Sequence, residues 1–311
     1  MTNQEKKNLI HDKLSILTPV INKDNIYYKR DDLFTPFDDE LLVKTIKNIN
    51  GTKLRQALSL LCDNLDYIKN ECANTIVAHQ SATTQQGILI TSCANVFDIN
   101  TVLVVGNIAD SSFESNPLIK NAYKLGAKFD RECKIAYNSV LDARVEKLVY
   151  EDSYFDFNFV SNMINNFDSI VEPVMQQCQN IPDNVEQVVV PAGNSIIFAA
   201  VACGIDKYNK SNVKEVIGIQ ISGMDRSETV YEIVEKYKQK YNKSQLSCNI
   251  NFILDKTYPY SKLVNANIGG IELDPVYEAK AYKYMENNID VTKSTLFWIA
   301  GTSEPSRTLN F

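Results

Sequence analysis

The feature that most constrains the fold of this chain is the alternation of short apolar runs with longer amphipathic segments. NTIVAH is followed by QQGILITSCANVF, and TVLVVGN is followed by NPLIKNAYKLGAKFD, which ends near Gly126. Short apolar runs are typical of buried strands, whereas apolar residues at helical spacing, as in TKLRQALSLLCDNLDYIKN, predict a helix. Strands that alternate with helices over short connections predict parallel sheets covered by helices on both faces.

The second half of the chain repeats this pattern. EQVVVPAGNSIIFAAVACGI reads as a buried strand, a small polar turn and a helix of small residues, and KEVIGIQISG and STLFWIAGT read as further strands. The stretch from about 137 to 184 is mostly helical and charged in character. At roughly 100–200 residues per domain, a chain of 311 residues corresponds to one large or two modest domains.

Composition and charge disfavour several classes of protein. The formal net charge is -6 and no Lys/Arg block stands out, which argues against a protein that follows nucleic-acid phosphates. No apolar stretch reaches the ~18 residues of a membrane helix, and the N-terminal sequence lacks the apolar region of a secretory signal. We therefore expect a cytoplasmic protein without membrane segments.

Cysteine and histidine usage limits the chemistry. The seven cysteines are widely spaced and include no C-x-x-C pair, which favours reduced structural thiols. The two histidines, His11 and His79, are too few for a His-rich metal site and disfavour a Ser–His or Cys–His catalytic pair. We expect no metal, and any chemistry must come from lysine, tyrosine, carboxylates or a bound cofactor.

Two glycine-containing turns are candidates for chemistry. In VVVPAGNSIIFAA, Gly193, Asn194 and Ser195 lead into a helix, whose free backbone N–H groups can bind an anion. An ordinary strand-to-helix connection gives the same pattern. In INGTKLRQAL, Lys53 lies at a loop-to-helix boundary, where a desolvated amine can attack a carbonyl. A surface lysine is the alternative there.

Three further segments could face a pocket. HQSATTQQGILIT places hydroxyls and amides at a strand end, where they could bind a carboxylate, or where Ser81 or Thr83 could cap a helix. In IELDPVYEAKAY, an Asp-Pro pair predicts a helix start that leaves Tyr277 and Glu278 in its first turn. A solvated glutamate is the alternative. TLFWIAGTSEP ends a strand at Thr302, a usual location of pocket residues in open α/β sheets.

Several of these motifs also match a known family in their order along the chain. They are Lys29 to Leu33 (KRDDL), Thr52 to Arg55, Gln80-Ser81, Leu125 to Ala127, Pro191 to Asn194, Leu273 to Lys280 (LDPVYEAK), Leu296 to Trp298 and Gly301-Thr302. Together they resemble the pyridoxal-phosphate (PLP) enzymes of fold type II, and more narrowly the 1-aminocyclopropane-1-carboxylate deaminase and D-cysteine desulfhydrase family. KRDDL and DPVYEAK are the specific motifs. The resemblance spans residues ~26 to ~303.

The resemblance implies a fold and an assembly. The expected fold class is α/β, with two parallel-sheet, three-layer α/β/α domains of the tryptophan synthase beta-like kind and the cofactor in the cleft between them. A smaller domain of residues 51–150 would be inserted into a larger one formed by residues 1–50 plus 151–311. The resemblance also implies a homodimer.

The resemblance assigns residues to the cofactor, pyridoxal 5'-phosphate. Lys53 matches the lysine that forms a Schiff base with the PLP aldehyde. Gly193, Asn194 and Ser195 match the loop that holds its phosphate. Thr302 is expected to contact the cofactor from the end of the last strand.

On the substrate side, Ser81 matches a hydroxyl that contacts the substrate carboxylate, and Tyr277 matches a tyrosine implicated in proton transfer. Tyr260 is the match to a second active-site tyrosine, with Tyr258 as the competing candidate. Glu278 matches the residue that faces the pyridine nitrogen. A carboxylate there keeps the nitrogen protonated and makes the ring a stronger electron sink, which within this family resembles the deaminase branch.

Some positions depart from the family pattern. Thr52 replaces the asparagine that usually precedes the lysine, Ala82 replaces the asparagine that contacts the phenolic oxygen of the cofactor, and Gln56 stands where a basic residue often helps to hold the phosphate.

The leading prediction is a PLP-dependent lyase or deaminase acting on a small amino acid. Because the substrate side differs, two alternatives stay open. One is a PLP enzyme acting on an amino acid tethered to a carrier or modified nucleobase, and the other is a catalytically silent binding protein.

Overall fold

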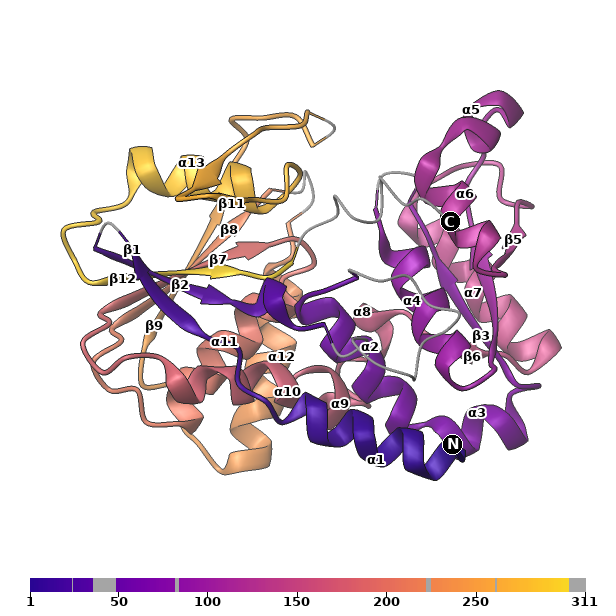
Figure 1. The fold of residues 1–311 in the computed structure, drawn as a ribbon, viewed down its shortest axis with the longest axis horizontal. Coiled ribbons are helices and arrows are strands. Elements are labelled where there is room, and N and C mark those ends of the chain that lie inside the picture. The colour runs from indigo at the N-terminus through magenta and orange to yellow at the C-terminus, as the bar shows by residue number, and fades with distance from the viewer. Residues whose placement is uncertain (24, 36–48, 82–83, 222–224, 261, 302–311) are drawn as a thin grey trace.

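The computed structural model describes residues 1–23, 25–35, 49–81, 84–221, 225–260 and 262–301. Two lobes lie side by side, each built around its own sheet (Figure 1). Three residues singled out from the sequence, Ala82, Thr83 and Thr302, lie outside the described residues. None of the helices in the described part of the chain combines the length and apolar character that crossing a bilayer requires.

A six-stranded sheet forms the centre of the larger lobe. In spatial order its strands are β1 (Val20–Lys23), β2 (Ile26–Arg30), β12 (Thr295–Ile299), β7 (Gln187–Ala192), β8 (Glu215–Gln220) and β9 (Asn249–Leu254). Neighbouring strands run parallel, except that β1 pairs antiparallel with β2. Because β12 lies between β2 and β7, both ends of the chain contribute to the same sheet.

Helices cover both faces of this sheet. They are α11 (Ile196–Lys207) and α12 (Ser227–Tyr241) on one face and α13 (Glu278–Asn288) on the other. Successive side chains of a strand point to opposite faces. Accordingly, Leu296 and Trp298 of β12 pack in the core that contains α11, and Phe297 and Ile299 pack in the core that contains α13. This is the three-layer arrangement expected from the sequence.

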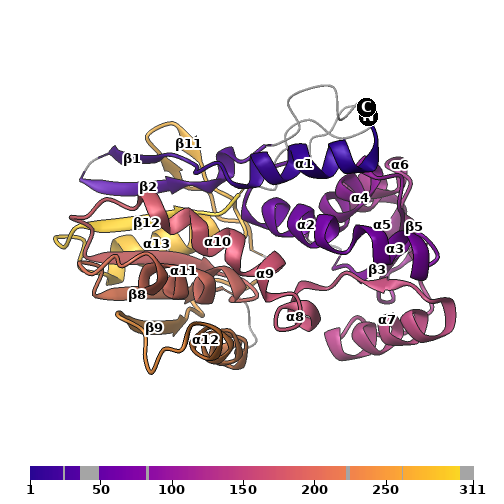
Figure 2. The same cartoon turned by 90° about the horizontal axis from the view of Figure 1, so that it is seen from below.

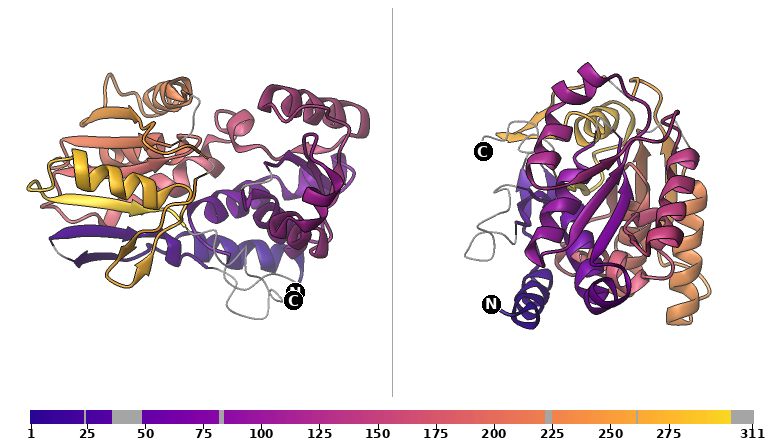
Figure 3. Two further views of the ribbon diagram at one scale, coloured as in Figure 1. Left: turned by 90° about the horizontal axis from the view of Figure 1, so that it is seen from above. Right: turned by 90° about the vertical axis from the view of Figure 1, so that its right-hand side faces the viewer.

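The smaller lobe has a four-stranded parallel sheet between two helical layers (Figure 3). Its strands, in spatial order, are β5 (Lys128–Asp130), β4 (Asn100–Val104), β3 (Thr75–His79) and β6 (Phe155–Asp156). Its main helices are α4 (Gln86–Val96) and α6 (Pro117–Lys124) on one face and α7 (Asn138–Asp152) on the other. The two sheets together confirm the α/β fold class.

Helix α2 (Thr52–Asp63) runs between the lobes and packs against α1, α4, α9 and α10 (Figure 2). The remaining elements are α1 (Asn3–Leu14), the 3-10 turn Asp31–Leu33, α3 (Leu65–Glu71), α5 (Asp110–Ser115), α8 (Phe159–Asn162), α9 (Phe167–Ile170), α10 (Glu172–Gln176), the 3-10 turn Gln177–Asn180, β10 (Asn267–Ile268) and β11 (Ile271–Glu272). The single helix predicted over TKLRQALSLLCDNLDYIKN is divided at Asn64, whose side-chain amide donates to the Leu60 carbonyl and competes with the helical ladder.

All seven cysteine thiols are unpaired and buried, in agreement with a structural role. Burial raises the pKa of Cys178 to about 12, because it disfavours the thiolate. Such thiols are poor nucleophiles at neutral pH. The chemistry of this chain must therefore be sought among other side chains.

Candidate active site

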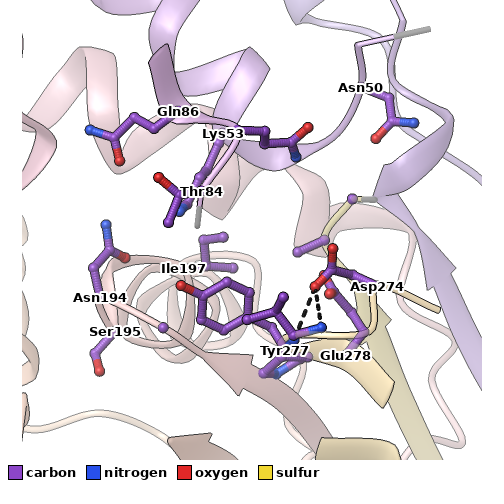
Figure 4. Close-up of a pocket in the computed structure, with 16 residues that line it drawn as sticks. Asn50, Lys53, Thr84, Gln86, Asn194, Ser195, Ile197, Asp274, Tyr277 and Glu278 are labelled. Atoms are coloured by element: carbon purple, nitrogen blue, oxygen red, sulfur yellow. Dashed lines mark hydrogen bonds between the residues drawn. The ribbon is translucent and has the colours of Figure 1, made fainter. Parts of the chain in front are cut away.

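One cavity collects most of the residues that the sequence singled out (Figure 4). It opens near the starts of α2, α11 and α13, and its empty volume is about 790 Å³, including the part open to solvent. The predicted residues that line it are Lys53, Gly193, Asn194, Ser195, Tyr277 and Glu278. These positions are far apart in the sequence and meet only in the fold.

Two residues close to Lys53, Thr52 and Arg55, hold the first turn of α2 in place. Thr52 donates its hydroxyl to Asp31 Oδ2 at 2.5 Å, and the Arg55 guanidinium donates to Asp31 Oδ1 at 3.1 Å. Asp31 and Arg55 are fully buried, so this pair has no competition from water. The KRDDL motif, which contains Asp31, therefore fixes the first turn of the helix that carries Lys53.

Gly51 makes the tight entry into α2 possible. Its φ is +98°, and a Cβ built on it would lie 2.3 Å from the Ala300 carbonyl oxygen. A side chain would therefore force apart α2 and the end of β12. The same Ala300 oxygen accepts a hydrogen bond from the Thr52 N–H at 2.7 Å, which joins the two segments at the edge of the cavity.

Lys53 is a half-buried residue, and its amine lies 5.8 Å from the centroid of the Tyr277 ring. Desolvation lowers the pKa of Lys53, and the nearby Glu278 and Asp274 carboxyls oppose this shift. A lysine that loses its proton more readily than usual has a larger nucleophilic fraction at neutral pH. Lys53 therefore lines the cavity with a lowered pKa, and its attack on a carbonyl stays a prediction.

The turn before α11 is built to receive an anion. Ser195 is the N-cap of this 12-residue helix, with φ +67°, and its side chain is 1% exposed. Within the described residues its hydroxyl has no hydrogen-bond partner. A buried unpaired hydroxyl costs about 1–3 kcal/mol, so a ligand that accepts its hydrogen bond would recover this energy. The helix dipole adds to the attraction for a negative group.

Gly193 lets the Tyr277 ring approach this turn, because a Cβ on Gly193 would lie 3.1 Å from Tyr277 Cε1. The phosphate of PLP fits the turn, since the buried Ser195 hydroxyl and the helix start supply donors there. The aldehyde of PLP fits Lys53, which lines the same cavity. The described residues are thus suited to the cofactor implied by the sequence resemblance.

Two tyrosines meet beside the cavity. The hydroxyls of Tyr260 and Tyr277 are 2.6 Å apart, and the Lys280 ammonium donates to the backbone oxygens of Pro259 and Tyr260 at 3.1 and 2.9 Å. Burial, and then Tyr260, raise the pKa of Tyr277 well above its ordinary value. The structure thus brings Tyr260 to Tyr277, whereas the ring of the competing candidate, Tyr258, lies 5.0 Å from the Lys262 ammonium.

Asp274 organises the start of α13. Its Oδ1 accepts from the N–H groups of Val276 and Tyr277 at 2.9 and 3.0 Å (Figure 4). The aspartate therefore caps the turn that precedes the helix, but the expectation that it would be the N-cap of the helix is wrong, because α13 begins at Glu278 with Tyr277 as its N-cap. Glu278 is 4% exposed, and burial raises the pKa of its carboxyl well above the usual range, with Asp274 adding to the rise.

The small-lobe wall of the cavity differs from the sequence prediction. Ser81 is exposed and is not among the described residues that line the cavity, whereas Thr84, Gln85 and Gln86 are. The helix begins at Gln86 with Gln85 as its N-cap, so Ser81 does not cap it. Asn50 also lines the cavity and was missed. Gln86 could have been singled out from the sequence, because it lies at the start of a helix that follows a strand.

Gln56 has a structural role. Its side-chain amide donates to the Ile170 carbonyl at 2.8 Å, and the residue is 1% exposed. It therefore joins α2 to α9 in the core. Gln56 is not among the described residues that line the cavity. It therefore does not take the place of the basic residue that often helps to hold the phosphate in the family.

Solved protein structures share this architecture. The crystal structure of an ACC deaminase homologue is similar with a TM-score of 0.70 and 17% sequence identity, over 94% of each chain. The processed form of threonine deaminase isoform 2 from Solanum lycopersicum is similar with a TM-score of 0.59 and 15% identity, over 97% of this chain and 90% of that one. This chain has the fold of the fold type II PLP enzymes. The fold type II architecture inferred from the motifs is therefore confirmed.

A fold type II chain can also be compared through its sequence. This one is 23% identical to the O-seryl-dTMP PLP-dependent decarboxylase of Salmonella phage ViI over 346 aligned positions, which cover 92% of this chain and 80% of the relative. No model of a known protein family matches the chain. The names of the similar proteins include deaminases and a decarboxylase, so the fold does not by itself select the reaction.

Proposed function

We propose that this chain is a PLP-dependent enzyme that removes the α-carboxyl group of an amino acid carried on a nucleotide. The observation that carries the proposal is the cavity that holds both the Lys53 amine and the buried, unpaired Ser195 hydroxyl at the start of α11. These two groups suit the aldehyde and the phosphate of one cofactor. A homodimer, a cytoplasmic location and a division into two domains belong to the same proposal, with the second boundary after β6 rather than at residue 150, because β6 pairs with β3 of the smaller lobe.

The residues that would hold PLP follow from their positions. Lys53 would bind its aldehyde carbon, the turn of Gly193, Asn194 and Ser195 would bind its phosphate, and Glu278 would face its pyridine nitrogen. Bound in this way, PLP withdraws electrons from a bond at the substrate Cα and so weakens that bond.

The side chains around it hold and move protons. Lys53 Nζ, with its lowered pKa, can exist as a free amine and can accept or deliver a proton at the substrate Cα. Tyr277 Oη, hydrogen-bonded to Tyr260 Oη, keeps a second proton next to the cavity. The Glu278 carboxyl has a raised pKa, so it can share a proton with a nitrogen placed opposite it.

The reaction type is supported by the sequence relative. That protein is named as a decarboxylase of O-seryl-dTMP, and the alignment covers 92% of this chain. In the proposed step the bond from Cα to the carboxyl carbon breaks, CO₂ leaves, and Cα takes up a proton in its place. The wall of Thr84, Gln85 and Gln86 carries no charged side chain, which is compatible with the neutral base of such a nucleotide.

A second candidate is deamination of a small free amino acid. Glu278 opposite the pyridine nitrogen favours it, because this choice resembles the deaminase branch of the family. The Tyr260–Tyr277 pair is compatible with the same chemistry, since it places a proton donor beside the cavity.

The experiment supplies the purified chain with PLP and O-seryl-dTMP labelled in its carboxyl carbon. We expect release of labelled CO₂ and retention of the amino nitrogen in the product. Free D-cysteine and 1-aminocyclopropane-1-carboxylate serve as comparison substrates. Ammonia release from either of them, without CO₂ from the nucleotide, would replace the proposal by the deaminase. A protein whose visible spectrum is unchanged by PLP would be a binding protein of this fold.

A further inference from the structure

The cavity has a rim of carboxamide side chains. We define this carboxamide rim as Asn50, Gln85 and Gln86, which line the cavity together with Thr84. Asn50 lies in the segment before α2, and the two glutamines lie at the start of α4. In Figure 4 the labelled Asn50 and Gln86 occupy opposite ends of one side of the cavity.

The amine and carboxyl groups of the cavity belong to other residues. Among the described lining residues these are Lys53 on α2, Asp274 before α13 and Glu278 at the start of α13. Asp274 is engaged by two backbone N–H groups, and Glu278 is held toward its uncharged form by burial. The amides of the carboxamide rim themselves offer a substrate group neutral donors and acceptors.

Carboxamides present a donor and an acceptor side by side. The N–H₂ and C=O groups of one glutamine can form two parallel hydrogen bonds, as Asn and Gln do with base edges in nucleic-acid recognition. The imide edge of thymine offers the matching pair, an N3–H donor beside the O4 acceptor. A charged side chain could supply only one half of this pattern.

An apolar surface lies beside these polar groups. Ile197, which is 8% exposed, and Val276 line the same cavity. A planar base can place its face against such side chains while its edge meets the amides. The lining therefore combines the two kinds of contact that a neutral heterocycle uses.

We infer that the carboxamide rim, with Gln86 as its main member, recognises the imide edge of a thymine base in the substrate. This inference rests on the proposed function, because it requires the amino acid to be carried on a nucleotide. It assigns substrate specificity to residues at the start of α4. Gln86 is singled out because it is the half-buried first residue of that helix.

The test measures binding separately from turnover. The full chain loaded with PLP is titrated by calorimetry with dTMP, with N3-methyl-dTMP and with the 5-phosphate of deoxyribose. We expect dTMP to bind at least about 10-fold more tightly than the N3-methyl compound, which cannot donate from N3. The sugar phosphate should bind more weakly still.

Two variants connect this preference to the carboxamide rim. Gln86→Leu should bind dTMP and N3-methyl-dTMP almost equally, and it should raise KM for O-seryl-dTMP while kcat stays within about threefold. Gln4→Leu is the matched control, because it makes the same change at an exposed residue of α1. It should keep the wild-type preference and the wild-type melting temperature.

The outcomes separate this inference from the proposed function. Equal binding of dTMP and N3-methyl-dTMP by the wild type, or an unchanged preference in Gln86→Leu, overturns the role of the carboxamide rim even if CO₂ is released. A clear dTMP preference that disappears in Gln86→Leu supports the role of the rim even if no decarboxylation occurs. In that case only the proposed reaction fails.

Discussion

The large-lobe side of the cavity is formed by a turn and a helix start, whereas the small-lobe side is formed by a loop and the first residue of α4. On the large-lobe side, the turn at 193–195 and the helix start at 277–278 lie where the motifs indicated. On the small-lobe side, Ser81 is exposed, and Thr84, Gln85 and Gln86 take its place. The large-lobe side depends on turns and helix starts, which have local sequence signals. The small-lobe side depends on which side chains a loop turns inward.

The largest expected effect is at Lys53, on the helix that runs between the two lobes. Lys53→Ala should lower turnover at least roughly 1,000-fold, because it removes both the amine that binds the aldehyde and a proton carrier. The visible absorbance of PLP-loaded protein should disappear with it. Lys120→Ala, at an exposed residue of α6, is the control. If Lys53→Ala kept the full visible absorbance, PLP would be attached to another residue.

A smaller effect is expected at the anion turn. Ser195→Ala should weaken PLP binding about 10-fold, because it removes one hydrogen bond to a charged group. Without PLP, the same variant should be at least as stable as the wild type in urea, because the unpaired buried hydroxyl is gone. The measurement is the change in stability caused by Ser195→Ala, which should be negative with PLP bound and zero or positive without PLP. Equal destabilisation in both states would mean that Ser195 is only a structural residue.

Glu278 gives a pH-dependent test of the same side. Burial raises its pKa, so between the unfolded value of about 4.3 and the raised folded value the folded protein binds the extra proton. Stability without PLP therefore falls as pH rises through this window, by about 1.4 kcal/mol per unit of pKa difference. Glu278→Gln removes this dependence. We expect the variant to be more stable than the wild type at pH 7 and the two to converge near pH 4 in urea unfolding.

The smallest effect compares two hydroxyls of the small-lobe side. Ser81→Ala should change turnover by less than about twofold, whereas Thr84→Val should lower it by about 2–10-fold, the value of one hydrogen bond. Steady-state kinetics on the same substrate gives both numbers. If Ser81→Ala proves the more harmful change, the result supports the family assignment of its hydroxyl to the substrate carboxylate.

Much of the fold follows from sequence periodicity. The run VVVPAG becomes β7, and the small residues after it become α11, because apolar runs and helical spacing are local properties. Strands β1 and β9 were not predicted, since they lie at the edges of the sheet and are only partly buried. Strand β9 pairs with β8, which is distant in sequence, whereas β1 pairs with β2, the next strand along the chain.

The site shows the same limit. The helix start that carries Lys53 was recognised, but its attachment to Asp31 through Thr52 and Arg55 was not, because residue spacing does not reveal contacts across about 20 positions. The motifs KRDDL and TKLR each resembled the family separately. The structure adds that Asp31 of the first motif and Arg55 of the second form one buried ion pair.

The only tryptophan in the chain, Trp298, is fully buried on β12, and the residues that follow this strand, Ala300 and Gly301, line the cavity. Indole emission overlaps the absorption of pyridoxal bound to a lysine. Resonance energy transfer from this one fluorophore should thus report the fraction of occupied sites in unlabelled protein. The fluorescence of Trp298 can therefore measure how much PLP is bound, without any substrate.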